Sequence, residues 1–232
     1  MNDNRHGKFW FGRAAQYVVR GLLVAVAALA VSGIASAQGK KNETLLSNPT
    51  TPTDITPPEG ASAFLVGHAF GTQGYVCLPS GGGTSWTINP ARPEATLFTN
   101  VFGLPFQIIT HFLSPDANPN KFAPDPLPLG GNVTWQSSLD SSRVWAVVFN
   151  DGKARIDAGS DESCPNAGSI PCLLLQSIGN QKGPTGGQLL AKVSFIQRLN
   201  TNGGSAPTTA CTAGQTQLVP YTADYFFYHG DN

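Results

Sequence analysis

The stretch "KVSFIQRLNTNGGSAPTTAC", residues 192–211, joins a strand pattern to turn residues and a cysteine. Within residues 191–199, apolar and polar residues alternate, which is the period of a half-buried β-strand. The Asn and Gly residues that follow, 200–204, tolerate positive φ and predict a tight reversal of the chain. We therefore expect a strand, a turn and a segment that Cys211 ties to another part of the fold.

Other parts of the chain have the same character. Runs rich in β-branched and aromatic residues, bounded by Gly, Pro, Asn or Asp, occupy residues 63–77, 106–113, 143–150, 189–199 and 221–229. The 26 glycines and 18 prolines leave no long helical period. The stretch "IPCLLLQSIG", residues 170–179, fits a helical turn or a buried strand equally well. The pattern predicts a single all-β domain over residues 61–232, either a β-sandwich or a β-barrel.

The N-terminal residues have the layout of a targeting segment. A basic start, from Arg5 to Arg20, precedes an apolar run over residues 21–35 and the small-residue pattern at residues 35–37. This predicts a signal peptide over residues 1–37, removed from a secreted or periplasmic protein. The apolar run is shorter than the roughly 20 residues of a membrane span, so no span is expected after cleavage. An uncleaved anchor is the alternative.

Residues 38–60 are rich in Thr, Pro and Asn and contain few apolar residues. Such a segment has little hydrophobic burial to offset the entropy of ordering. We expect a flexible leader here.

All four cysteines, Cys77, Cys164, Cys172 and Cys211, follow the predicted cleavage point. An even number in an oxidising compartment predicts two disulfides, with three pairings open. The short loop 164–172 favours Cys164 with Cys172, which leaves Cys77 with Cys211. The C-x-x-C spacing of zinc sites is absent, so neither a metal nor a cofactor is predicted.

Charge limits the partners that we expect. The chain has 14 Lys and Arg against 14 Asp and Glu, and removal of residues 1–37 leaves it weakly acidic. No basic patch is evident, which argues against nucleic-acid binding. The sequence gives no indication of oligomeric state.

Two stretches near the C-terminus, "SFIQRLNTNGGSAPTTAC" (194–211) and "VPYTADYFFY" (219–228), resemble the signature of an uncharacterised secreted family, the domain of unknown function 3455. The stretches "GTQGYVC" (71–77), "TWQSSLDSSRV" (134–144) and "IPCLLL" (170–175) occur in the same order as in that family. The family usually has Trp at the position of Cys172. The resemblance implies a secreted domain with a Cys77–Cys211 pair and no established activity.

Two histidines are candidates for a site. His68 lies among apolar residues in the 63–77 run, and His111 shares a face with Ile109 and Leu113. If both point inward they meet, and facing imidazoles bind a metal or transfer a proton. The alternative is a pair of hydrogen-bonded core histidines.

Three more residues are candidate ligand contacts. Gln197 stands where the strand period expects an apolar residue, and with Gln73 it either ties strands together or lines a ligand cavity. Trp135, next to a Gly-rich loop, is a candidate for an exposed stacking platform. Asp140 and Asp224 are expected to form salt bridges with Arg143 or Arg198.

No G-x-S-x-G motif is present, and no catalytic residue is identified. The expected function is therefore that of a non-catalytic binding or structural protein, with a small molecule or a glycan as its partner. One alternative is a secreted enzyme whose site uses His111, His68 and a carboxylate, with or without a metal. Another is an inhibitor or interaction module that acts on another secreted protein.

Overall fold

The computed structural model describes residues 46–114, 132–157, 164 and 168–230, without the side chains of residues 90–93. The predicted signal peptide, 1–37, lies outside these residues. Within the described ranges, no helix is both long and apolar enough to cross a membrane. One short 3-10 helix, η1 (Thr53–Ile55), precedes the strands. The strands are β1 (Ser62–Ser80), β2 (Gly83–Val101), β3 (Leu104–Ser114), β4 (Asn132–Ser137), β5 (Arg143–Val148), β6 (Ile156–Asp157), β7 (Cys172–Gln181), β8 (Phe195–Gly203) and β9 (Thr216–His229).

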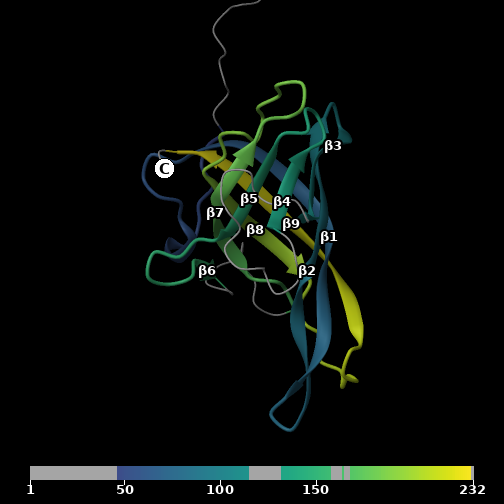
Figure 1. Cartoon of the computed structure of the whole chain (residues 1–232). Helices are drawn as coiled ribbons and strands as arrows, with labels where there is room; N and C mark the ends of the chain where they lie inside the picture. Colours follow the sequence, from purple (N-terminus) through teal and green to yellow (C-terminus); the bar gives the residue numbers. More distant parts are fainter. Residues whose placement is uncertain (1–45, 115–131, 158–163, 165–167, 231–232) are drawn as a thin grey trace, which may run out of the picture. The chain divides into compact units, whose positions relative to one another are not determined.

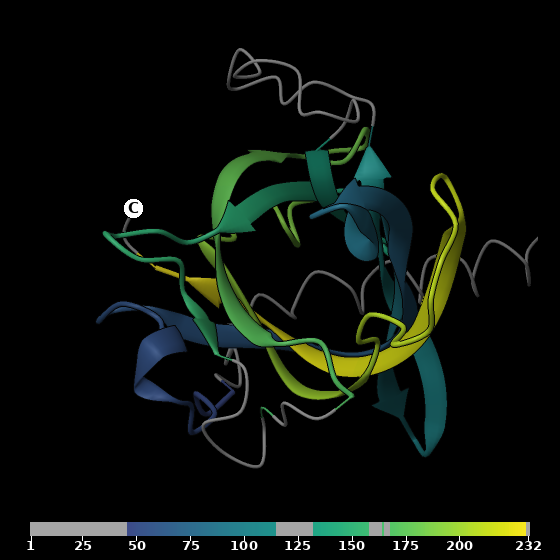
Figure 2. The ribbon, with the colours of Figure 1, turned by 90° about the horizontal axis from the view of Figure 1, so that it is seen from below.

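The strands form one antiparallel sheet that closes on itself. Their order is β5-β4-β3-β2-β1-β9-β8-β7-β6, and β5 also pairs with β7. Strands β1–β5 and β7–β9 thus make a closed ring, and β6 adds only to β7 (Figure 1). Seen along its axis in Figure 2, the sheet surrounds a central space. The all-β prediction is confirmed, and of the two predicted architectures the protein has the barrel.

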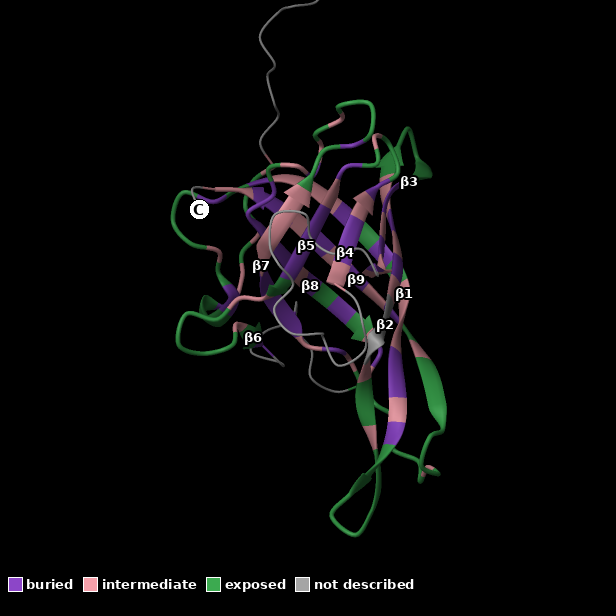
Figure 3. Ribbon diagram, viewed as in Figure 1, coloured by how far each residue is buried: buried purple, intermediate pink, exposed green. Residues whose placement is uncertain are grey.

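Successive side chains along a strand point to opposite faces, so each strand of the barrel has one set inside and one set outside. In Figure 3 the buried residues lie mainly in the strands of the ring, and the turn that joins β1 to β2 is exposed. In the central part of β1 the inward residues are small: Gly67, Ala69 and Gly71. A Cβ on Gly71 would lie 2.2 Å from the backbone oxygen of Glu94, so no larger residue fits there. Phe70, between Ala69 and Gly71, lies on the other face and is 60% exposed. The apolar face of this strand, which contains His68, therefore turns outward instead of inward.

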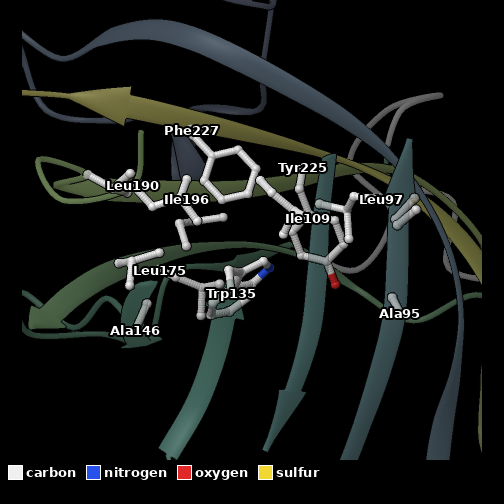
Figure 4. Packing of buried hydrophobic residues seen from close by; sticks show 14 of the residues in the cluster. Ala95, Leu97, Ile109, Trp135, Ala146, Leu175, Leu190, Ile196, Tyr225 and Phe227 are labelled. Atoms are coloured by element: carbon white, nitrogen blue, oxygen red, sulfur yellow. The ribbon is translucent and has the colours of Figure 1, made fainter. Parts of the chain in front are cut away.

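One end of the barrel is filled by side chains. The segment between β7 and β8 places Leu190, which is fully buried, inside the ring beside Ile196 and Phe227 (Figure 4). Two hydrogen bonds hold this segment to the turn between β4 and β5. The backbone N–H of Leu189 donates to Asp140 Oδ2 at 2.9 Å, and that of Leu190 donates to Ser142 Oγ at 2.9 Å. We call this the plugged end.

A second core lies on the outer face of β7, β8 and β9. Ile55 of η1 is fully buried there with Leu174, Phe195 and Tyr228. Asn48 adds polar contacts, since its side chain accepts from the N–H of Ala63 at 2.8 Å and donates to the oxygen of Ala61 at 3.0 Å. Residues 46–60, which belong to the segment expected to be a flexible leader, thus contact the barrel through Asn48 and Ile55. The segment has few apolar residues, but Ile55 supplies a buried apolar contact.

Beyond the barrel, β1 and β2 continue as a hairpin arm that turns at Gly81 and Gly82, both with positive φ. The disulfide Cys77–Cys211 fastens the segment between β8 and β9 to this arm, and Cys164–Cys172 closes the short loop. Both predicted pairings are confirmed. The tight reversal expected at residues 200–204 is instead an irregularity within β8, which continues to Gly203.

Candidate ligand cavity

The half of the barrel interior away from the plugged end is hollow. A cavity of about 580 Å³ opens near β6 and the base of the arm. Its walls are mainly apolar and include Val133, Ala146, Val148, Leu173 and Leu175. A volume of this size falls within the range of about 300–1,000 Å³ that small-molecule sites occupy.

Exposed apolar side chains surround the mouth of the cavity. Ile88 of β2 is 56% exposed and Ile156 of β6 is 42% exposed, and both line the opening. Ala206, from the segment after β8, is exposed and lines it as well. The mouth therefore offers apolar contact to a molecule that enters.

His111 of β3 is buried and lies at the inner part of the cavity. Its Nδ1 lies 3.0 Å from the backbone oxygen of Thr134, and because a carbonyl only accepts, Nδ1 carries the proton. Nε2 is then an acceptor. Burial lowers the pKa of His111 to about 4 against the opposing effect of the Thr134 hydrogen bond, and the charge of Arg198 lowers it further. The imidazole is neutral at pH 7.

Trp135 of β4 is buried, so it is not the exposed platform that the sequence suggested. Its indole stacks on the His111 ring, with centroids 4.1 Å apart and 14° between the planes. Both face inward because they are register partners on neighbouring strands. Trp135 Nε1 is buried without a hydrogen-bond partner. Figure 4 shows the indole directed into the interior with the ring of Tyr225.

Arg198 of β8 brings a positive charge to the cavity. Its Nε and Nη2 both donate to the backbone oxygen of Pro171, at 3.1 and 2.8 Å. Among the described residues no carboxylate forms an ion pair with it, and no Asp or Glu lines the cavity.

Tyrosines complete the inner surface. Tyr75 donates its hydroxyl hydrogen to the backbone oxygen of Gly204 at 2.6 Å, and the hydroxyls of Tyr221 and Tyr225 lie 3.1 Å apart. Burial raises the pKa of Tyr75 and of Tyr221, while the charge of Arg198 acts in the opposite direction on both. The hydroxyls of Tyr75 and Tyr221 stay protonated at neutral pH.

The structure brings together three of the five candidate contacts. Gln73, His111 and Trp135 all line the cavity, from β1, β3 and β4. His68 and Gln197 lie elsewhere, so the two histidines do not meet.

His68 lies on the outer face of β1, with its side chain 54% exposed. Its Nδ1 lies 2.6 Å from Asp224 Oδ1, and Asn200 Nδ2 donates to Asp224 Oδ2 at 2.7 Å. Asp224 therefore pairs with His68 and not with an arginine.

Gln197 lies on the outer face of β8, within the second core. Its Nε2 donates to the oxygen of Ile55 at 2.7 Å, and its Oε1 accepts from the hydroxyl of Tyr228 at 2.7 Å. Both ends of the amide are satisfied, and they join η1 to the barrel.

Asp140 makes no salt bridge with Arg143 or Arg198 either. Although burial alone would raise its pKa, hydrogen bonds from Leu189, Ser142 and Ser137 hold the pKa of Asp140 at about 2. Its carboxylate therefore fastens the plugged end. Nowhere in the described ranges do three His, Cys, Asp or Glu side chains gather as a metal site.

Arg198 is the charged cavity residue that sequence reasoning missed, and Tyr75 and Tyr225 were missed as well. Arg198 shares the polar face of its strand with Ser194, a pattern that indicates solvent exposure. The available signal was that Ile196, on the same face, is apolar.

Comparisons with known proteins place most of the chain in one family. The model of the family described as "Protein of unknown function (DUF3455)" matches residues 57–229. No curated protein and no solved structure matches the chain. The match covers every strand and every described residue that lines the cavity.

Proposed function

Because the chain belongs to the DUF3455 family, whose description names no activity, we propose from the cavity that this is a non-catalytic binding protein for a small, mostly apolar molecule. The single observation behind this proposal is the cavity of about 580 Å³ with one open end. The interior of an eight-stranded barrel is either filled by side chains or holds one small ligand. Here the plugged end is filled and the other half is not.

The chemistry of the walls favours an apolar molecule over a glycan. A sugar requires many hydrogen-bonding groups, because each buried hydroxyl without a partner is costly. Most of the exposed wall surface is apolar, from Val, Leu, Ile and Ala side chains, and the polar side chains on it are those of Gln73, Asn89, His111, Ser169, Arg198 and Ser205. Trp135 stacks on His111, so the indole face on that side is not available to a sugar ring.

The alternative of a histidine-based enzyme receives less support. His111 is held by a backbone carbonyl and not by a carboxylate, and a pKa of about 4 makes it a weak base at neutral pH. His68, the other expected member of that site, is outside the barrel.

Export to the cell exterior or the periplasm is part of this proposal. The basic and apolar segments of residues 1–37 support it, and two disulfides fit an oxidising compartment.

The test is a titration with the neutral fluorescent probe phenylnaphthylamine. Ala206→Trp places a large side chain at the mouth, whereas Ala210→Trp changes an exposed alanine of the same segment that does not line the cavity. We expect the wild type and Ala210→Trp to bind the probe alike and Ala206→Trp to bind it at least about tenfold more weakly. Equal binding by all three proteins would show that the probe does not enter the barrel.

A further inference from the structure

We propose that the ligand of the cavity is an organic anion, with an apolar body and one negatively charged group that pairs with Arg198. This inference rests on the proposed function and adds the chemical class of the ligand. The cavity combines apolar walls with a cation, since Leu173 and Leu175 line it together with Arg198.

Arg198 has N–H donors that its hydrogen bonds do not use. A guanidinium has five N–H groups, and two of them are used on the carbonyl oxygen of Pro171. The other three have no acceptor among the described residues. A carboxylate or sulfonate matches such a set of donors, because its oxygens accept parallel hydrogen bonds from one guanidinium.

Among the described residues, no carboxylate compensates the charge of Arg198. A cation that faces an apolar cavity loses hydration, and a neutral carbonyl returns only part of that energy. No Asp or Glu lines the cavity in the described part of the chain, and His111 is neutral at pH 7. The cavity is therefore a net positive compartment with apolar walls, in which an anion is the missing partner.

The mouth of the cavity also suits a ligand that has an apolar body and one charged group. Ile88 and Ile156 are exposed apolar residues at the opening, and Arg198 lies in register with Ile156, since both pair with Leu173. A ligand with a charged group at one end therefore places its apolar body between the walls and keeps that group near the mouth, beside Arg198.

Two dyes with a common aromatic body test the inference. Anilinonaphthalene sulfonate carries an anion that phenylnaphthylamine lacks. We expect the wild type to bind the sulfonate about tenfold or more tightly than the neutral dye, the scale of a hydrogen bond to a charged group. Arg198→Gln should lose this preference and retain the neutral dye, while Arg198→Lys should keep part of it.

The control variant is Lys192→Gln, which removes an exposed positive charge from the segment before β8 and should leave the preference intact. A preference that falls equally in Lys192→Gln and Arg198→Gln would overturn the inference, since net charge would then explain it. So would a wild type that binds both dyes equally. If neither dye is sensitive to Ala206→Trp, the proposed function itself fails.

If Arg198→Gln does not fold because it loses the contact with Pro171, a comparison of two ligands on the wild type is the test. In the wild type, dodecanoate should displace phenylnaphthylamine at least about tenfold more effectively than dodecanol, on the same energetic scale. Equal displacement by the acid and the alcohol would overturn the inference without any variant.

Discussion

The imidazole of His111 lies flat against the indole of Trp135, with ring centroids 4.1 Å apart, while its Nδ1 donates to the backbone of Thr134. The stack buries the imidazole in its neutral form. Protonation therefore requires a charge to be placed in a mainly apolar interior, which gives the barrel a defined response to acid.

Stability should fall as the pH is lowered from 6.5 towards 4. The pKa of His111 is about 4 in the folded protein and 6.5 without the fold, so in this window the unfolded chain binds the proton more readily. The loss should reach on the order of 3 kcal/mol near pH 4. Chemical denaturation of the wild type at several pH values measures it.

His111→Phe is the control for this pH dependence, because it retains an aromatic ring against Trp135 and cannot titrate. The variant should be less sensitive to pH between 6.5 and 4 than the wild type. Equal slopes for the two proteins would assign the pH dependence to other groups.

Asp140→Asn should destabilise the plugged end. The carboxylate accepts hydrogen bonds from the backbone of Leu189 and from Ser142, and hydrogen bonds to a charged group contribute about 1.5–3 kcal/mol. We expect a loss of about 2–3 kcal/mol at pH 7 in a denaturant titration. The pKa of Asp140 is lowered to about 2, so the wild type should keep this stability above pH 3.8 and lose it as the pH falls towards 2. The free energies of unfolding of the wild type and Asp140→Asn should therefore become similar near pH 2.

Gly71→Ala should be far more harmful than Gly83→Ala. A methyl group on Gly71 would meet the backbone oxygen of Glu94 at 2.2 Å, and the backbone cannot move aside without breaking the β1–β2 pairing. We expect a loss of roughly 3 kcal/mol, as for other overpacked positions. Gly83, at the tip of the arm, has no neighbour closer than 3.9 Å, and its variant should melt within a degree or two of the wild type.

Loss of the long-range disulfide should cost more than loss of the short one. Cys77 and Cys211 are 134 residues apart, whereas Cys164 and Cys172 are separated by 8. In the chain-entropy description the longer loop gives the larger effect, and removal of Cys77–Cys211 should cost about 2–5 kcal/mol. Paired Cys→Ser variants and denaturant titration compare the two; a greater loss from the short bridge would contradict the loop-length argument.

The N-terminus of the protein recovered from its native host should be Gln38. This follows from the basic start, the apolar run and the small residues 35–37. Intact-mass measurement checks it, and a soluble cytoplasmic species that retains residues 1–37 would refute the export proposal.

Alternation and turn residues were enough to predict an all-β domain, but not every strand. The segments that became β1, β3, β5, β8 and β9 were expected, at least in part, from their apolar and aromatic residues. β2 was missed because the sequence has prolines at residues 90 and 93, which normally argue against a strand interior. β4 was missed because only two of its residues, Val133 and Trp135, are apolar.

Only part of the site was predicted, because the strand pattern leaves one question open. A two-residue period separates two faces of a strand and does not say which one is inside. In β8 both faces are buried, Phe195 under η1 and Ile196 inside the barrel, so the polar side chain of Arg198 gave no sign of its position. Gln73 and His111 were identified because a polar residue in an apolar run is unusual wherever the run lies.

The pairing of β1 with β9 determines when the chain can finish folding. Ser62 lies opposite His229, so the barrel cannot close until the first strand, β1, pairs with the last strand, β9. Hairpins such as β1–β2 form locally, but closure joins residues at opposite ends of the domain and is a slow, late event. If the chain crosses a membrane from its N-terminus, the sheet on the far side would therefore stay open until β9 had crossed. Only then could the barrel close around its cavity.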